Sequence, residues 1–345
     1  MTQPDHTIFL TSPLEEANIA RLRAVAPERV RVIYEPELMP ELRYVADHKG
    51  KPSIRSVAQI ERFRNCLAQA DILFDLPSVE DLPFCAKLRW VQTSSTGVGP
   101  SVARLGLDKT DALITTARGV HAGPLAEFTI MALLAHFRGL ASLQAEQRAH
   151  RWIRTCGEEV AGRTLVTIGA GDLARGVARI AQALRMRVIA VARDATKLRP
   201  DGLFDEVIPG LALRDALSRA DAVVVTVPDT AATAGMIGPG EIAAMKTGCA
   251  FVNIGRGTVI DEQALIVALQ SGQIGFAALD VTTIEPLPPE SLLWDLPNVL
   301  ISPHSASTVS TENAKITDIF IANLRLFLDG KHAEMRNILD KTLLY

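Results

Sequence analysis

The sequence predicts an α/β fold, in which helices pack against parallel sheets. Short apolar segments rich in valine and isoleucine alternate with amphipathic helical segments along most of the chain. Segments such as AVVVTVP show no polar–apolar alternation, which is typical of strands buried on both faces of a parallel sheet. With 345 residues, the chain is long enough for two domains of roughly 100–200 residues each.

The predicted strands fall into two series, separated by a helical segment. The first series consists of TIFLTS, RVIYEP, DILFDL, RWVQTSS and LITTA. The separating segment, GPLAEFTIMALLAHFRGLASLQAEQ, predicts one long and mostly buried helix because apolar residues cover nearly its whole surface. The second series consists of TLVTIGA, RVIAVAR, AVVVTVP, AFVNIG, AALDV and NVLIS. TENAKITDIFIANLRLFLDGK then predicts a closing helix that ends at Gly330.

Composition argues against several classes of partner. The net charge of −3 gives no reason to expect nucleic acid or an anionic membrane surface. We see neither a signal peptide at the N-terminus nor an apolar run long enough to span a membrane. No cluster of His, Cys and Asp has metal-binding spacing, so no metal is expected. The cysteines are widely spaced and are interpreted as reduced thiols of a cytoplasmic protein: Cys66, Cys85, Cys156 and Cys249.

The sharpest local motif is a glycine-rich loop between a predicted strand and a predicted helix. In TLVTIGAGDLARGVA, Gly169 allows a tight turn, Gly171 lets a pyrophosphate approach the backbone, and Ala174 permits close helix–strand packing. The helix N-terminus then attracts the anion. This context predicts dinucleotide binding by the loop that also contains Asp172 and Leu173. The Asp172 carboxylate would repel phosphates if it pointed inward, so it either faces solvent or caps the helix.

The end of the next predicted strand bears on the choice of cofactor. An acidic residue there is typical of NAD-binding proteins, whereas an arginine accommodates the 2′-phosphate of NADP. Here Ala192 occupies the position where the acid is expected, and Arg193 and Asp194 follow. NADP is therefore favoured over NAD, the alternative being that Arg193 is a solvated surface charge.

Three charged side chains each follow a predicted strand of the second series. They are Arg256 in NIGRG, Glu285 in TTIEPLP and His304 in SPHSAS. Open α/β sheets bind ligands at this carboxyl edge. Arg256 is either a structural residue or an anchor for a carboxylate, which its guanidinium matches. Glu285 and His304 are either two solvated side chains or a proton-transfer pair.

These segments carry a family resemblance. VTIGAGDLARGVA, FVNIGRGTVIDEQALIVALQSGQIGFAALDV, EPLPPESLLWDLPNV and SPHSAS resemble the D-isomer-specific 2-hydroxyacid dehydrogenases. Upstream, STGVGPSVARLGL, ITTARGVHAGPLAEFTIMALL and Trp152 extend the likeness, which begins at about Leu88. Within the family, LDVTTIEPLP and the arginine after the second strand look most like the glyoxylate/hydroxypyruvate reductase branch.

The resemblance implies an NAD(P)-dependent reductase of small 2-keto acids to 2-hydroxy acids. It implies that His304 is the general acid/base, that Glu285 is its hydrogen-bonded partner, and that Arg256 holds the substrate carboxylate. The physical chemistry agrees, because a protonated imidazole can neutralise the charge that develops on the ketone oxygen. A neighbouring carboxylate favours that protonated form.

The resemblance also assigns further positions one at a time. Thr233 could instead cap a helix, and Asp280 could instead be an ion-pair partner without contact to cofactor. The implied substrate-binding residues are Thr96, Gly97, Arg256 and Ser307. The implied cofactor-binding residues beyond the glycine-rich loop and the second strand are Val227, Pro228, Thr233, Ile254 and Asp280.

The fold that follows has two doubly wound, Rossmann- or flavodoxin-like domains with a cleft between them. The substrate-binding domain is expected to be discontinuous, residues 1–118 and 306–345, and the dinucleotide-binding domain to cover 119–305. The helix from Leu125 is expected to link the domains and to help form a homodimer, as in the family. Domain closure would exclude water from the reacting atoms.

Competing interpretations within this fold are weighed by particular features. Formate dehydrogenases pair their histidine with glutamine rather than with a glutamate such as Glu285. The longer phosphoglycerate dehydrogenases have a regulatory domain that is not expected here. The alternative from another class is an NAD(P)-sensing binding protein or corepressor of the same fold. Three departures from the family pattern are Gly99, Ala306 and the segment Leu42–Ile60.

Overall fold

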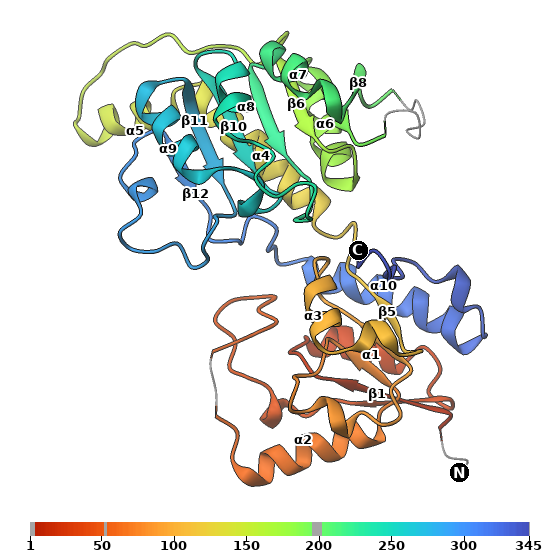
Figure 1. Cartoon of the computed structure of the whole chain (residues 1–345). Helices are drawn as coiled ribbons and strands as arrows, with labels where there is room; N and C mark the ends of the chain where they lie inside the picture. The colour runs from red at the N-terminus through yellow and green to blue at the C-terminus, as the bar shows by residue number, and fades with distance from the viewer. Residues whose placement is uncertain (1–3, 52–53, 195–201, 345) are drawn as a thin grey trace. The chain divides into compact units, whose positions relative to one another are not determined.

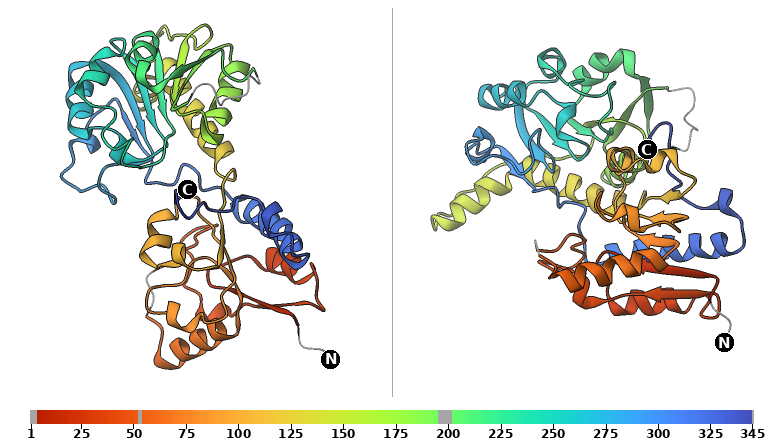
Figure 2. Two further views of the ribbon diagram at one scale, coloured as in Figure 1. Left: turned by 45° about the vertical axis from the view of Figure 1, so that its right-hand side comes forward. Right: turned by 60° about the horizontal axis from the view of Figure 1, so that its bottom comes forward.

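The computed structural model describes residues 4–51, 54–194 and 202–344 of the chain (Figure 1). It divides into two compact units, Met1–Val120 with Thr308–Tyr345, and His121–Ser307. We call them unit 1 and unit 2. Each contains one parallel sheet with helices on both faces, which confirms the predicted α/β class (Figure 2). The chain passes between the units twice, so unit 1 is built from both ends of the sequence.

Unit 1 has a five-stranded parallel sheet in the order β2-β1-β3-β4-β5, the order found in flavodoxin-like proteins. Phe9 of β1 pairs with Ile33 of β2 and Leu73 of β3. The strands are β1 (His6–Leu10), β2 (Val30–Ile33), β3 (Ile72–Phe74), β4 (Trp90–Gln92) and β5 (Leu113–Thr115). The α-helices are α1 (Glu16–Arg23), α2 (Val57–Gln69), α3 (Gly99–Arg104) and α10 (Glu312–Leu328).

The two faces of this sheet bury separate hydrophobic clusters. Successive side chains of a strand point to opposite faces, so Ile8 and Leu10 pack on one side and Phe9 on the other. Helices α1 and α10 cover the first face, where Phe320 of α10 stacks on Phe74 with ring centroids 5.9 Å apart. Helices α2 and α3 cover the second face. Burial on both faces explains why apolar residues predominate in the strands of this unit.

Unit 2 has a seven-stranded parallel sheet in the order β12-β11-β10-β9-β6-β7-β8. The order reverses between β6 and β9, which is the arrangement of dinucleotide-binding sheets. Helices α4 and α6 cover one face, and α7, α8 and α9 cover the other. The strands are β6 (Thr164–Ile168), β7 (Arg187–Ala192), β8 (Glu206–Pro209), β9 (Ala222–Val225), β10 (Cys249–Asn253), β11 (Ile274–Leu279) and β12 (Val299–Ile301). The α-helices are α4 (Ala122–Phe137), α5 (Leu140–Arg148), α6 (Asp172–Ala183), α7 (Leu213–Arg219), α8 (Pro239–Ala244) and α9 (Glu262–Ser271).

Two expected elements differ from the structure, and one strand of the structure was not expected. The long helix after Gly123 is in fact two helices, because Gly139 adopts a left-handed φ of 65° between them, and no residue of α5 is buried. Helix α10 ends at Leu328, and Gly330 (φ 72°) takes the left-handed position just beyond it. Strand β8 was not predicted, since its four residues lack a clear apolar run.

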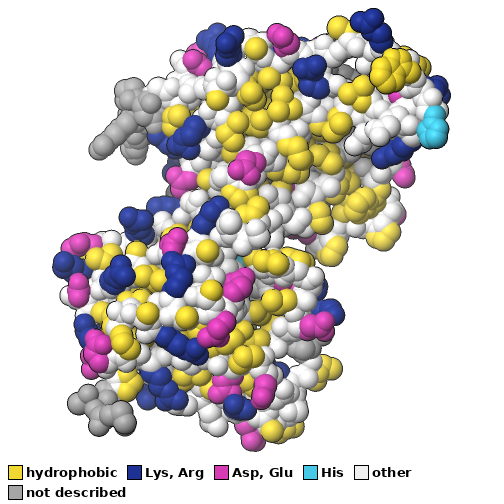
Figure 3. Space-filling model, turned by 180° about the vertical axis from the view of Figure 1, so that it is seen from behind, with side chains coloured by type: hydrophobic (Ala, Val, Ile, Leu, Met, Phe, Trp, Pro, Cys, Tyr) yellow, Lys and Arg dark blue, Asp and Glu magenta, His cyan; other side chains and the backbone are white. Residues whose placement is uncertain are grey.

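The surface carries mixed charge. On the face drawn in Figure 3, Lys and Arg side chains are interspersed with Asp and Glu, in keeping with the net charge of −3. Within the described residues, no helix has both the length and the apolar character required of a membrane span.

The contact between α4 and α6 depends on a glycine. A Cβ at Gly176 would lie 2.9 Å from the carbonyl oxygen of Ala122, closer than real Cβ contacts allow. We expect Gly176→Ala to lower the free energy of unfolding by about 1–2 kcal/mol, because overpacking outweighs the gain in helix propensity. Urea denaturation followed by circular dichroism measures the change.

Gly123→Ala is the matched control, since Gly123 is also helical and a Cβ there would meet nothing within 4 Å. It should leave the free energy of unfolding unchanged or raise it by up to about 1 kcal/mol. Equal changes in the free energy of unfolding for Gly176→Ala and Gly123→Ala would contradict the steric conflict proposed between a Cβ at Gly176 and the Ala122 carbonyl.

Candidate functional site

The glycine-rich loop joins β6 to α6 at the carboxyl edge of the unit 2 sheet. Gly169 has φ +109°, and a Cβ there would lie 2.5 Å from Oγ1 of Thr226, so both backbone angle and space require glycine. Gly171 caps α6, and a Cβ there would meet nothing within 4 Å. The space before the helix N-terminus is therefore open, and the helix dipole favours an anion in it. These features fit the pyrophosphate of a dinucleotide.

The other predicted cofactor-binding residues of this part of unit 2 lie on α6 and just after β7. Asp172 is the first residue of α6 and is exposed, and Leu173 packs partly against the unit 2 core. Arg193 follows β7 directly and is exposed, and Asp194 beside it is half-buried. Exposure of Arg193 at a strand end is compatible with contact to a ribose phosphate.

The NIGRG loop follows β10 and is fixed by its neighbours. Asn253 accepts a hydrogen bond from the Gly255 amide at 3.0 Å and donates one to the Arg256 carbonyl at 3.0 Å. A Cβ at Gly255 would approach the Val227 carbonyl to 2.7 Å, and one at Gly257 would overlap the Thr282 carbonyl. Two adjacent loops thus press against the NIGRG loop at its two glycines.

Arg256 is half-buried between these glycines. Its Nη1 donates to the carbonyl oxygen of Gly255 at 2.7 Å. Among the residues that the structure describes, no carboxylate forms an ion pair with Arg256. Most donors of its guanidinium therefore remain for a carboxylate ligand.

His304 and Glu285 form a contact pair. Nδ1 of His304 lies 2.7 Å from Oε2 of Glu285, and both side chains are partly exposed. The Thr282 amide donates to the other carboxylate oxygen of Glu285 at 3.2 Å. His304 adopts φ 52°, a left-handed angle uncommon for a residue with a side chain. The surrounding hydrogen bonds must therefore hold this backbone in place.

Asp280 supplies those hydrogen bonds. The residue is only 4% exposed, and its Oδ1 accepts from Oγ of Ser302 at 2.8 Å, the Ser305 amide at 2.9 Å and the Ala306 amide at 2.8 Å. The backbone carbonyl of Asp280 accepts from the His304 amide at 2.9 Å. Asp280 thus organises the turn that carries His304. Whether Asp280 also contacts the cofactor stays a prediction.

The remaining predicted site residues of unit 2 lie in the loops that follow β9, β10 and β12. Val227 and Pro228 follow β9, and Ile254 follows β10 and is buried. Oγ1 of Thr233 donates to the Pro228 carbonyl at 2.6 Å and accepts from the Thr230 amide at 2.9 Å, so it closes a turn rather than capping a helix. Ser307 ends unit 2, three residues after His304.

Thr96 and Gly97 belong to unit 1, where they are exposed in the loop between β4 and α3. Unit 2 therefore brings together His304, Glu285, Arg256 and Asp280, while the loop of Thr96 and Gly97 is built on the other sheet. Gly99 follows this loop, and a Cβ there would overlap the carbonyl oxygen of Leu344. Gly99 departs from the family pattern, and the close packing of the C-terminal segment explains why a residue without a side chain stands there.

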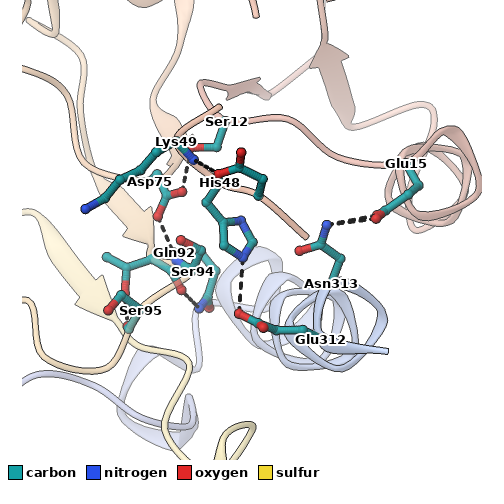
Figure 4. A network of polar contacts seen from close by, with 12 residues as sticks. Ser12, Glu15, His48, Lys49, Asp75, Gln92, Ser94, Ser95, Glu312 and Asn313 are labelled. Atoms are coloured by element: carbon teal, nitrogen blue, oxygen red, sulfur yellow. Dashed lines mark hydrogen bonds and ion pairs between the residues drawn. The ribbon is translucent and has the colours of Figure 1, made fainter. Parts of the chain in front are cut away.

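The segment Leu42–Ile60 is described except for residues 52 and 53. The buried carboxylate of Asp47 anchors it by accepting from the amides of Arg43 and Gly50 at 3.1 and 3.0 Å, and Nε of Arg43 donates to it at 2.7 Å. His48 Nε2 lies 3.3 Å from Oε1 of Glu312 at the start of α10 (Figure 4). The described part of the segment thus comprises a loop, which contacts α10 through His48, and the first residues of α2.

Two residues of the site were missed by sequence reasoning, Asn253 and Ser302. Asn253 is the last residue of the buried strand β10 and Ser302 follows the half-buried strand β12, and a polar residue at a strand end is the only signal that could have pointed to them. Elsewhere, His136 stacks on Phe276 with ring centroids 4.9 Å apart, and burial lowers the pKa of His136. No group of three or more metal-ligating side chains occurs in the described ranges.

Comparison with known proteins identifies the family. Residues 130–306 match the model of the D-isomer specific 2-hydroxyacid dehydrogenase, NAD binding domain. The chain belongs to the D-isomer specific 2-hydroxyacid dehydrogenases. It is an NAD(P)-dependent dehydrogenase, as the sequence predicts.

Individual relatives support this assignment. The glyoxylate reductase of Korarchaeum cryptofilum is 31% identical over 278 residues, which are 79% of this chain and 82% of the relative. A D-isomer specific 2-hydroxyacid dehydrogenase family protein from Aeromonas salmonicida superposes with a TM-score of 0.81 at 27% identity, covering 98% of this chain and 99% of its own. A dehydrogenase of the same name from Xanthobacter autotrophicus, solved with NADPH and MES, gives a TM-score of 0.78 at 25% identity, covering 99% and 100%.

The packing of Thr282 on Gly257 generates a prediction about turnover. In Gly257→Ala, the new Cβ would displace the Thr282 carbonyl and with it the loop that carries Glu285. We expect kcat to fall at least ~10-fold, because Glu285 is a predicted catalytic residue and small misplacements of such groups are costly. Cofactor binding, measured by fluorescence titration, should change by less than about threefold in Kd.

Thr258→Ala is the control, since Thr258 is the exposed neighbour in the same turn. It should retain the wild-type kcat. An unchanged kcat in Gly257→Ala would show that the contact with Thr282 does not position Glu285.

Proposed function

We propose that this enzyme transfers hydride between NAD(P)H and a small 2-keto acid of the glyoxylate or hydroxypyruvate kind, giving the D-2-hydroxy acid. The observation that carries the proposal is the 2.7 Å contact between His304 and Glu285. It lies on the same sheet edge as the glycine-rich loop and Arg256. A dinucleotide cradle, a proton donor and a carboxylate anchor are the groups that this reaction needs.

In the proposed mechanism, His304 handles the proton. The nicotinamide cofactor, when bound, supplies the hydride. Glu285 occupies Nδ1 of His304, so Nε2 is the nitrogen that gives a proton to the ketone oxygen as negative charge develops there. Arg256 holds the substrate carboxylate through charged hydrogen bonds. Asp280 keeps the turn of His304 in place throughout, and the reverse reaction returns the proton to His304.

Unit 1 would complete the substrate site. In this proposal, the backbone at Thr96 and Gly97 binds the substrate carboxylate together with Arg256, and Ser307 contacts substrate or nicotinamide. In this proposal, residues 1–118 and 306–345 form the substrate-binding domain and residues 119–305 form the dinucleotide-binding domain.

We further propose a cytoplasmic homodimer. Several apolar side chains on and after α4 are exposed: Met131, Leu140, Leu143, Trp152 and Ile153. Their exposure on neighbouring segments supports a contact with a second copy of the chain. Cys66, Cys85 and Cys249 are buried free thiols, and burial raises the pKa of Cys85 to about 11. Such unreactive thiols suit a reducing compartment.

The experiment that tests the function is oxidation of NADPH and NADH with glyoxylate, hydroxypyruvate and phenylpyruvate. The wild type should turn over at least one 2-keto acid. In His304→Ala, turnover should fall by ~100-fold or more because the proton donor is lost, and cofactor binding should persist. Absorbance at 340 nm measures turnover, and fluorescence titration measures cofactor binding.

Glu285→Gln is the matched variant, because it keeps a side chain of the same size near Nδ1 without the charge. Its turnover should lie between those of wild type and His304→Ala. Wild-type turnover in His304→Ala would remove His304 from the proposed role, and no turnover of any keto acid by the wild type would reject the proposed substrate class.

NADP is the proposed cofactor, supported by Arg193 at the end of β7. Arg193→Ala should raise the Kd of NADPH by ~10-fold or more, because one charged hydrogen bond contributes about 1.5–3 kcal/mol. The Kd of NADH should change by less than about threefold, since NADH lacks the 2′-phosphate. Isothermal titration with both cofactors decides the point.

Arg175→Ala provides the control, because Arg175 is a half-buried arginine in the first turns of α6. It should not alter the ratio of the two dissociation constants. Equal weakening of NADPH and NADH in Arg193→Ala would mean that Arg193 does not distinguish the cofactors.

A further inference from the structure

Asp75 has a conformation that requires explanation. It follows β3 at the carboxyl edge of the unit 1 sheet, on the strand beside β1 where the strand order reverses. Its φ is +75°, in the left-handed region. Aspartate tolerates this region better than most residues, but the conformation still costs about 1 kcal/mol or more. Nearby contacts must therefore hold it.

The Asp75 carboxylate joins the ends of three strands. Oδ2 accepts a hydrogen bond from Oγ of Ser12, which lies after β1, at 2.6 Å. Oδ1 accepts from the amide of Ser94, which lies after β4, at 2.7 Å. The Asp75 amide donates to the carbonyl of Gln92 at 2.8 Å. Figure 4 shows Asp75 between Ser12 and Ser94, with Gln92 beside them.

The contact with Ser94 lies directly before the loop of Thr96 and Gly97. Ser94 is 7% exposed, whereas Thr96 and Gly97 are exposed. The next carbonyl, that of Ser95, accepts from Oγ1 of Thr93 at 2.7 Å and from the Ala117 amide at 3.2 Å. The loop is thus held at its base on both sides, while its tip remains accessible. The base determines the direction of the backbone at the tip.

We propose that Asp75 is a positioning residue for substrate binding. By holding the Ser94 amide, it orients the backbone of Ser95–Gly97 so that this loop binds the carboxylate of the 2-keto acid. The inference rests on the proposed function, in which Thr96 and Gly97 bind that carboxylate. Asp75 itself does not touch substrate in this account; it acts through the loop.

The carboxylate is present in both the substrate and the transition state. Loss of a contact that serves both states raises KM and leaves kcat unchanged. Asp75→Ala removes the acceptor, so KM for the keto acid should rise ~10-fold, the value of about one charged hydrogen bond. The kcat should stay within about threefold, and the Kd of the cofactor should not change. A purely structural role would lower the active fraction, and hence kcat, without raising KM.

Two matched variants separate the causes. Asp75→Asn keeps the acceptor atom and the tolerance for the left-handed backbone, so KM should return to within about threefold of wild type. Asp75→Gly relieves the backbone angle and lacks the acceptor, so its KM should rise as in Asp75→Ala. A wild-type KM in Asp75→Gly would assign the effect to backbone strain and overturn the proposal.

The decisive experiment measures KM and kcat of the wild type and the three variants with glyoxylate and phenylpyruvate. The KM increase should be the same for both, because they share the carboxylate and differ in the side chain. An increase confined to phenylpyruvate would overturn the proposal, since Asp75 would then shape the side-chain pocket. Unchanged KM in Asp75→Ala would overturn it as well.

Hydrogen exchange of the Ser94 amide tests the positioning without any turnover. Protection should be lost in Asp75→Ala and Asp75→Gly and kept in Asp75→Asn. Equal protection in all four proteins would overturn the proposal whatever the kinetics. If the wild type turned over no keto acid, the proposed function would fail, and the exchange result would still decide whether Asp75 holds the loop.

Discussion

The buried carboxylate of Asp280 is the contact on which the arrangement of the candidate site depends. Three donors of the turn from Ser302 to Ala306 converge on one of its oxygens. His304 lies within that turn in a left-handed conformation that a free chain would seldom adopt. Without the convergence, the imidazole would have no defined direction, and the contact with Glu285 would be one of many rotamers. The proposed proton-transfer pair of His304 and Glu285 therefore depends on a second carboxylate, that of Asp280, which need not exchange a proton.

Close packing of the loops adds a second constraint. The NIGRG loop has a neighbour at each of its two glycines, Val227 at Gly255 and Thr282 at Gly257. Three strand-end loops consequently form one layer along the carboxyl edge. A side chain at Gly255 or Gly257 would push the neighbouring loops apart and would displace Arg256 and Glu285. The glycines thus serve the geometry of Arg256 and Glu285 as much as the flexibility of their own backbone.

The two units use a similar device on different sheets. In unit 2, Asp280 follows β11 and binds donors of the loop after β12. In unit 1, Asp75 follows β3 and binds donors after β1 and β4. In each case a carboxylate at the end of a strand holds hydrogen-bond donors beyond a neighbouring strand, from one neighbour at Asp280 and from two at Asp75. Parallel sheets place all carboxyl ends on one edge, so a short acidic side chain there can reach across to adjacent strands.

The sequence by itself determined the fold class, the family and the local motifs. Apolar runs buried on both faces, the glycine-rich loop and the order of NIGRG, EPLPP and SPHSAS are local patterns, and local patterns can be read without coordinates. The break at Gly139 and strand β8 were not foreseen, because one glycine and four weakly apolar residues are weak signals. Only the tertiary structure decided that Asp280 holds the turn of His304, that Gly257 abuts Thr282, and that Asp75 joins Ser12 to Ser94. These contacts join residues up to 63 positions apart. No spacing rule covers them, since they depend on which strands lie side by side and on the direction in which each strand end points.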